Sequence, residues 1–398
     1  MSYERIVKTQ SVMKRVLLAY MSTLCAFQSF GAIDIIFDYT YDTSNWFGDE
    51  QRYIMDQAAY AFESRLGSET FGSLNPSDYA GTSGNYYLNS LNPVSGQQLL
   101  VNFGSTTPVD GARLTGGNTL GLADTITIFP GAGAASGSTL AWASGVHTGG
   151  SSGTDSTSSS DKFVEYLDNV RDTISNYDSV GGTISVNHSY NWYFDTDLTD
   201  FDDTTGKFDF YSVMVHEIGH LMGFRDGSDA WDNNYSANTW VGAFGVAANS
   251  GNPIPMDAAS QSHFNSSELN SSHVGCACHP IMDVSSGMNE RGSFTELDFA
   301  VLKDIGYSIS ASPSGGGIND GNTYTDPDWG GTHYIPIKED YGTWLARVGS
   351  VGAGGAYVPP SAAPEPAYIF SFMGGFIALL RGRKKIRKIK SYLLPSFP

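Results

Sequence analysis

The chain has 398 residues and a net charge of −19, with 22 lysines and arginines against 41 aspartates and glutamates. This length suits one large domain or two ordinary ones, and three cysteines are too few for a disulfide scaffold. The first 32 residues carry +3 and residues 367–398 carry +7, so the body between them carries about −29. Such a body argues against nucleic acid as a partner and favours solubility and the attraction of cations.

The N-terminus has the pattern of a secretory signal. Lys14 and Arg15 precede a largely apolar run from Val16 to Phe27, which is too short to span a bilayer. Small residues then allow cleavage after Gly31 or Ala32. We expect residues 1–32 to be removed on export, and the alternative is a buried first helix.

The body that follows alternates strand-like and helix-like patterns. A helix is expected over 49–66, ended by Gly67, and another near 161–175. Apolar residues at helical spacing form the core face of the first helix: Met55, Ala59, Phe62 and Leu66. Strands are expected at 33–37, 98–103, 124–129, 139–143 and 183–187. These patterns predict an α/β (α+β) fold with a mixed sheet.

An acidic loop comes after the last of these strands and contains Asp195, Asp197, Asp200, Asp202 and Asp203. Carboxylates at this density suit Ca²⁺, although the loop lacks the glycine of an EF-hand. A solvated acidic loop is the alternative interpretation.

The segment His216-Glu217-Ile218-Gly219-His220 is the most informative motif in the chain. Asp209 suits the N-cap of a helix that would carry it, and Gly223 suits its end. Two histidines four residues apart lie on one helical face and can bind one zinc ion. Glu217 is then placed to take a proton from a zinc-bound water.

The remainder of the body is irregular over 227–292 and then forms a closing helix. Thr295 and Asp298 have the spacing of a capping box, and Gly306 ends the helix. Cys276-Ala277-Cys278 is compatible with a local disulfide, two free thiols or a second metal site.

The C-terminal part begins with a Gly/Pro-rich stretch, 311–363, expected to be a linker. Pro364-Glu365-Pro366 follows, then an uncharged run from Ala367 to Leu380, then a basic cluster. The uncharged run is marginal in length for a membrane span, and the basic cluster would hold it on the cytoplasmic side.

Residues 33–310 resemble a metzincin-type zinc metalloprotease. The resemblance rests on His216-Glu217-x-x-His220-x-x-Gly223 and on a Met-turn-like segment, His279-Pro280-Ile281-Met282-Asp283. Residues 138–143 resemble the edge strand that pairs with substrate, and 297–307 resemble the last helix of leishmanolysin-type members. The resemblance implies a mixed twisted sheet, an active-site helix, an irregular C-terminal subdomain with the Met-turn, and a closing helix.

The third zinc ligand departs from the usual metzincin pattern, because Asp226 stands where a third histidine is expected. Asp226 could bind zinc, as in snapalysin-like variants. We favour His263, since Ser262-His263-Phe264 resembles the distant ligand of leishmanolysin-like enzymes and imidazole is the commoner partner of two histidines. His273 and His279 are further candidates.

Residues 364–398 resemble a PEP-CTERM sorting signal of Gram-negative bacteria. The resemblance implies export, transient anchoring of the tail in the inner membrane, and processing by an exosortase-type enzyme. The body would then act in the periplasm, at the cell surface or outside the cell.

We therefore expect a secreted zinc endopeptidase with Glu217 as general base, His216, His220 and His263 as ligands, and protein or peptide substrates. The alternative is an exported surface or matrix protein that uses a protease-like scaffold. A zinc hydrolase acting on another substrate class also fits the motif.

Overall fold

The computed structural model describes residues 33–67, 72, 86–102, 123–150, 181–199, 206–225, 228–265, 280–283, 291–310, 323–325 and 332–348. They belong to one compact unit, residues 1–356; residues 357–398 form a second unit. The expected signal, the helix near 161–175, the cysteine pair and the sorting tail lie outside the described residues. Within the described residues, no helix has the length and apolarity to cross a membrane.

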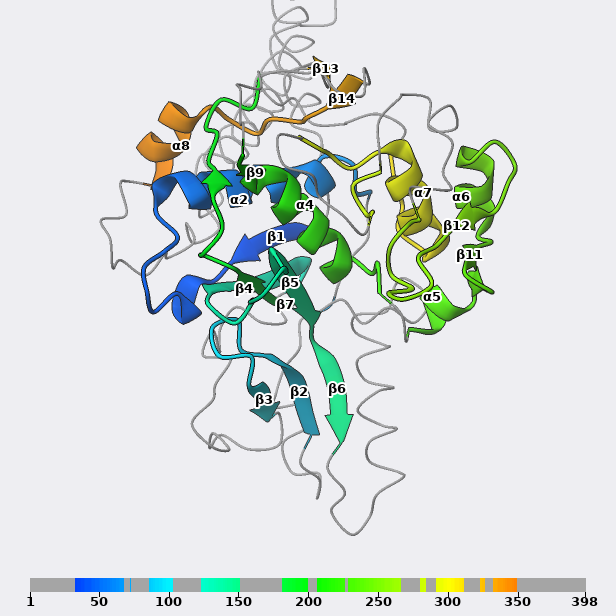
Figure 1. The fold of residues 1–398 in the computed structure, drawn as a ribbon, viewed down its shortest axis with the longest axis horizontal. Coiled ribbons are helices and arrows are strands. Elements are labelled where there is room, and N and C mark those ends of the chain that lie inside the picture. The colour runs from blue at the N-terminus through cyan, green and yellow to red at the C-terminus, as the bar shows by residue number, and fades with distance from the viewer. Residues whose placement is uncertain are drawn as a thin grey trace, which may run out of the picture. The chain divides into compact units, whose positions relative to one another are not determined.

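A four-stranded mixed sheet forms the centre of the body (Figure 1). Its order is β1 (Asp34–Phe37), β4 (Thr125–Ala132), β7 (Gly181–Val186) and β5 (Ala141–Gly145). The first three strands run parallel, and β5 pairs antiparallel with β7. The expected mixed α/β fold is therefore confirmed. β5 stands at the edge, and among the described residues no further strand of this sheet lies on the other side of its backbone.

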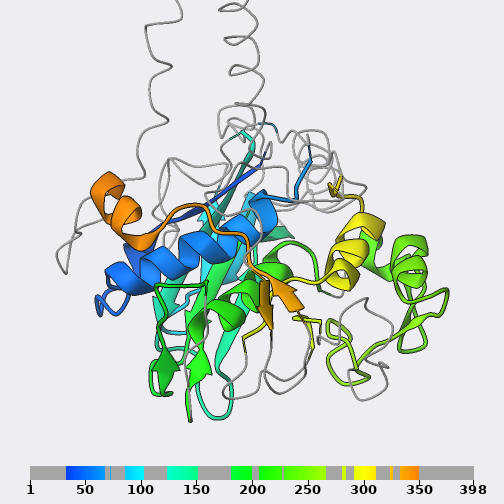
Figure 2. The same ribbon diagram turned by 90° about the horizontal axis from the view of Figure 1, so that it is seen from above.

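Two helices cover one face of this sheet: α2 (Asp49–Glu63) and α4 (Phe210–Leu221). They lie side by side across the strands (Figure 2). The expected core residues Met55, Ala59, Phe62 and Leu66 are buried, although α2 ends at Glu63, before the expected end at residue 66. Asp209 caps α4 by accepting a hydrogen bond from Ser212 N, as expected. Gly182 faces α4, since a side chain there would meet Leu221 and the backbone of β5.

A smaller antiparallel sheet lies at the end of the edge strand and consists of β3 (Gln98–Asn102), β2 (Tyr86–Leu91) and β6 (His147–Gly150). Ser90 Oγ donates to Ser144 O at 3.0 Å, and Thr183 Oγ1 donates to Leu91 O at 2.7 Å. These bonds hold the end of β2 against β5 and β7.

The region expected to be irregular contains short elements after α4. They are α5 (Asp229–Asp232), β10 (Tyr235–Ser236), β11 (Thr239–Trp240), α6 (Ala243–Ala248) and β12 (Ile254–Pro255). The expected closing helix follows as α7 (Glu296–Asp304). The capping box expected at the start of α7 is present. Asp304 accepts hydrogen bonds from Trp240 Nε1, Phe244 N and Gly245 N, which joins α7 to α6.

The remaining described elements are short. They are η1 (Tyr39–Tyr41), β8 (Trp192–Tyr193), β9 (Phe208–Asp209), β13 (Thr323–Thr325), β14 (Thr332–Tyr334) and α8 (Tyr341–Val348).

Part of the stretch expected to be a linker packs against α2. Trp344 on α8 is 1% exposed, and its indole N–H donates to Asp56 at 2.6 Å. Lys338 N donates to Gln57 Oε1, and Tyr53 donates to Glu339 O. Residues 335–348 therefore belong to the folded body.

Replacing Trp344 tests this packing. Trp344→Ala should lower the free energy of unfolding by about 3–5 kcal/mol, because it leaves a cavity and removes the donor to the half-buried carboxylate of Asp56. Trp344→Phe removes the N–H but keeps most of the volume, so its loss should be clearly smaller. Urea denaturation measures both, and an unchanged midpoint for Trp344→Ala would contradict the packing.

Candidate metal centre

Helix α4 is fixed at its start by a buried ion pair. Arg291 is 1% exposed and lies 2.8 Å from Asp209 Oδ1 and 2.8 Å from Asp195 Oδ2. Asp209 also caps the helix, so the same carboxylate holds both the helix start and the segment that contains Arg291. Breaking such a buried pair would leave an uncompensated charge, at a cost of about 3–5 kcal/mol. The start of the motif helix therefore has little freedom to shift.

The other end of α4 stops at a sharp turn. Gly223 has φ of 121°, a conformation that favours glycine, and Phe224 N donates back to Gly219 O. This turn brings Phe224 O to 2.6 Å from His220 Nδ1. The turn after the helix thus contributes directly to the orientation of a motif histidine.

His263 comes from a loop over forty residues further along the chain. Its neighbour Phe264 bridges to Met256 and to Asp283, and Phe264 N donates to Met282 O at 2.8 Å. Asp257 closes the loop by accepting from Ser260 N and Ala259 N. These contacts present His263 to the face of α4 that carries the two motif histidines.

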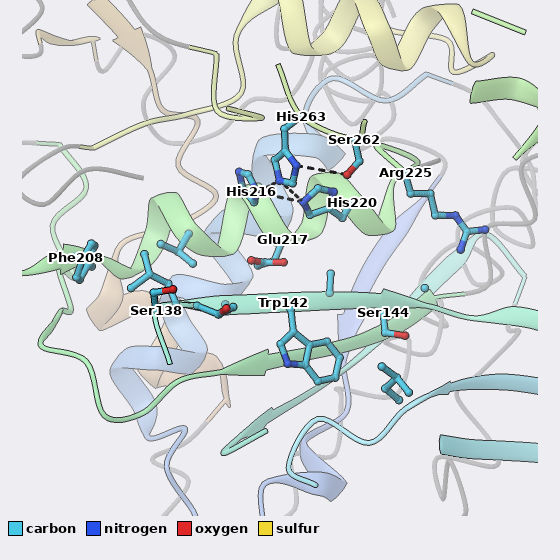
Figure 3. A pocket seen from close by; sticks show the side chains of 17 residues that line it. Ser138, Trp142, Ser144, Phe208, His216, Glu217, His220, Arg225, Ser262 and His263 are labelled. Atoms are coloured by element: carbon cyan, nitrogen blue, oxygen red, sulfur yellow. Dashed lines mark hydrogen bonds between the residues drawn. The ribbon is translucent and has the colours of Figure 1, made fainter. Parts of the chain in front are cut away.

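The three histidines converge on one point (Figure 3). Each pair of Nε2 atoms among His216, His220 and His263 is 3.1 Å apart. Three nitrogens in a tetrahedral shell about 2.0–2.1 Å from a zinc ion would be about 3.3–3.4 Å apart. The spacing therefore fits three ligands of a single ion.

The outer ring nitrogens determine which atoms face the centre. His216 Nδ1 lies 2.7 Å from Ile281 O and His220 Nδ1 lies 2.6 Å from Phe224 O. A carbonyl can only accept, so each Nδ1 carries the proton and each Nε2 of a neutral ring carries a lone pair. His263 Nδ1 lies 2.9 Å from Ser260 Oγ, which can accept in the same way.

The rings are also held in the neutral form that a metal requires. Burial lowers the pKa of His216 and of His220, and it lowers the pKa of His263 to about 3. Neutral Nε2 lone pairs at 3.1 Å repel one another unless a cation lies between them. The donor set thus fits a divalent metal.

No protein-family model matches this chain, and no curated protein matches it.

Met282 packs against helix α4 at Gly219. It is fully buried, and a side chain on Gly219, which lies between His216 and His220, would meet Met282 Sδ at 2.5 Å. The sulfur therefore packs against the backbone of α4 at the residue before His220. The sequence-based expectation of a packed methionine at this position is consistent with this contact.

The loop around Met282 is anchored by α7. Asp298 is fully buried and accepts hydrogen bonds from Thr295 N at 2.7 Å, Ile281 N at 3.2 Å and Met282 N at 3.3 Å. Burial raises the pKa of Asp298 to about 6, and these donors partly offset that effect. The same carboxylate therefore caps α7 and holds the loop whose carbonyl orients His216.

Glu217 lies between the histidines and the edge strand β5 (Figure 3). It accepts a hydrogen bond from Ala143 N, while its Oε2 has no hydrogen-bond partner among the described residues. Burial raises its pKa to about 8. A cleft of about 740 Å³ runs along β5 and is lined by Glu217, the three histidines, Trp142 and Arg225.

The structure brings together all four expected site residues: His216, Glu217, His220 and His263. Asp226, the alternative ligand, lies outside the described residues, as do His273 and His279. Of the acidic loop, Asp195 pairs with Arg291, while Asp200, Asp202 and Asp203 are not described. The carbonyl partners of the histidines were not anticipated, because main-chain acceptors leave no motif in the sequence. The position of Arg225 in the cleft was not anticipated either.

Removing His263 tests whether this histidine is the third metal ligand beside His216 and His220. His263→Ala should weaken zinc binding by more than about 100-fold, since removal of an outer partner alone costs about 10–100-fold. His188→Ala, a change at an exposed histidine, is the matched control and should bind as the wild type does. Asp226→Ala should also retain zinc. Competition titration with a chromogenic chelator measures all three, and the reverse ranking of His263→Ala and Asp226→Ala would favour the aspartate ligand.

Gly219→Ala tests the contact between Met282 and α4. The added methyl group would collide with Met282 Sδ and Phe294, so we expect lower thermal stability and weaker zinc binding. Met282→Ala alone should also destabilise the protein, by about 2–5 kcal/mol. If the two residues touch as described, the double variant should be more stable than the sum of the two losses predicts. Additive losses would show that the two sites are independent.

Proposed function

We propose that the chain is an exported zinc-dependent endopeptidase of the metzincin type. The observation that carries this proposal is the arrangement of Glu217 between the three histidines and an open strand edge in one cleft. The sorting tail and the secretory signal expected from the sequence support export to the periplasm, the cell surface or the medium.

The open edge offers a peptide a row of backbone partners. Leu140 O accepts from Asn187 N and Val146 N donates to Gly181 O, so the even-numbered residues of this stretch bond to β7. Antiparallel pairing alternates, which leaves the N–H and C=O groups of Ala141, Ala143 and Gly145 pointing outward. Ala143 N–H bonds to Glu217, as this alternation requires. An extended peptide can add to this edge as a further strand.

His216, His220 and His263 would hold the ion, and bound zinc supplies Lewis acidity that polarises a carbonyl and lowers the pKa of water. Glu217, through its unpartnered oxygen, takes a proton from the attacking water as the water oxygen bonds to the peptide carbonyl carbon. The proton then passes to the amide nitrogen and the C–N bond breaks. The products are a new carboxyl terminus and a new amine.

Glu217→Gln tests this mechanism. Zinc content and folding should be retained, while peptidase activity should fall by at least about 100-fold because the general base is lost. Glu50→Gln, at an exposed glutamate on α2, serves as the matched control and should keep wild-type activity. Casein hydrolysis is the measurement, and phenanthroline should abolish it.

Two results would contradict the proposal. Casein cleavage at the wild-type rate by Glu217→Gln would exclude this residue as the base. A zinc-loaded wild type that hydrolyses no peptide would instead favour the surface-protein alternative.

A further inference from the structure

Arg225 stands out among the residues of the cleft by its charge. Among the described residues that line the cleft, it is the only arginine or lysine, in a body that carries about −29. It follows the turn at Gly223 and is half-buried. Its side chain extends away from the histidines, toward the far end of β5 (Figure 3).

The guanidinium lies directly on the edge strand at Gly145. A Cβ built on Gly145 would be 2.7 Å from Arg225 Nη1 and 3.5 Å from its Cζ. Glycine at this position therefore leaves the space that the guanidinium occupies. The contact places a fixed positive charge beside the last outward-facing backbone group of β5.

The spacing of residues along β5 gives the distance between the Arg225 guanidinium and the peptide bond that would be cleaved. Glu217 bonds to Ala143, and Gly145 is two residues further along, about 7 Å at strand spacing. Antiparallel pairing is somewhat more stable than parallel pairing, so a bound peptide should run opposite to β5. Its residues on the N-terminal side of the cleaved bond would then pass Gly145 and Arg225.

We propose, building on the proposed function, that Arg225 is a specificity-determining residue that selects substrates with an acidic side chain about two residues before the cleaved bond. A guanidinium presents a planar fork of donors that matches a carboxylate and does not match an amide equally well. Asp or Glu at this substrate position therefore gains an ion pair with two parallel hydrogen bonds, whereas Asn or Gln offers one uncharged acceptor oxygen.

Peptide binding tests this proposal without requiring cleavage. The probe is a fluorescein-labelled, otherwise neutral octapeptide with Glu or Gln at each position in turn, bound to the zinc-loaded full chain carrying Glu217→Gln. Fluorescence anisotropy should show about tenfold tighter binding of Glu than of Gln at one position. Adding Arg225→Gln should reduce that ratio to about one, and Arg225→Lys should keep part of it.

Two further variants separate recognition from packing. Gly145→Ala displaces the guanidinium, so it should also reduce the ratio. Lys303→Gln removes one exposed positive charge outside the cleft and should leave the ratio unchanged. The proposal would be overturned if the Glu-to-Gln binding ratio were unchanged in Arg225→Gln, or if Lys303→Gln lowered that ratio as much as Arg225→Gln does.

Cleavage by the wild type then shows where the preferred Glu lies relative to the cleaved peptide bond. Mass spectrometry of the products should place the preferred Glu before the cleaved bond, and a preference after it would overturn the assignment. If the wild type cleaves none of the peptides, the proposed peptidase function fails, while the binding ratios still decide whether Arg225 recognises carboxylates.

Discussion

Three imidazole nitrogens with their lone pairs turned toward one another repel unless a cation lies between them, and much of the fold serves to hold them there. His216 and His220 are rigid because α4 is capped by a buried ion pair at one end and stopped by Gly223 at the other. His263 is held by the bridges of Phe264 to two neighbouring segments. The fold thus holds three nitrogen donors in an arrangement that fits a single metal ion.

The packing of α4 on the sheet also connects the candidate metal site to the cleft. The face of α4 that packs on the sheet and the face that carries the histidines belong to one short helix, so the sheet edge and the site keep a fixed relation. Glu217 contacts both, through its bond to Ala143 and its place beside His216. Asp298 connects the closing helix α7 to the loop whose carbonyl at Ile281 bonds to His216. The candidate metal ligands and the edge of the cleft are therefore held in place by the same few contacts.

The sequence predicted the parts of this arrangement that are local. The start of α4 at Asp209, the capping box at Thr295 and the edge strand near 139–143 follow from short-range patterns, and the structure contains all three, with the strand shifted by two residues to Ala141–Gly145. His263 was anticipated only through resemblance to a family, because nothing within its own loop specifies a metal. The packing of Trp344 on α2 was not foreseen, since few of the described side chains in this Gly/Pro-rich stretch are buried and the hydrogen-bond partner of Trp344 lies 288 residues away.

Zinc K-edge X-ray absorption of the zinc-loaded full chain tests the central claim most directly, because it counts and identifies the ligands without depending on activity. Three imidazole nitrogens at about 2.0–2.1 Å with one further oxygen is the result that the three-histidine centre predicts. A shell with sulfur at about 2.3 Å, or with only two imidazoles, would contradict it.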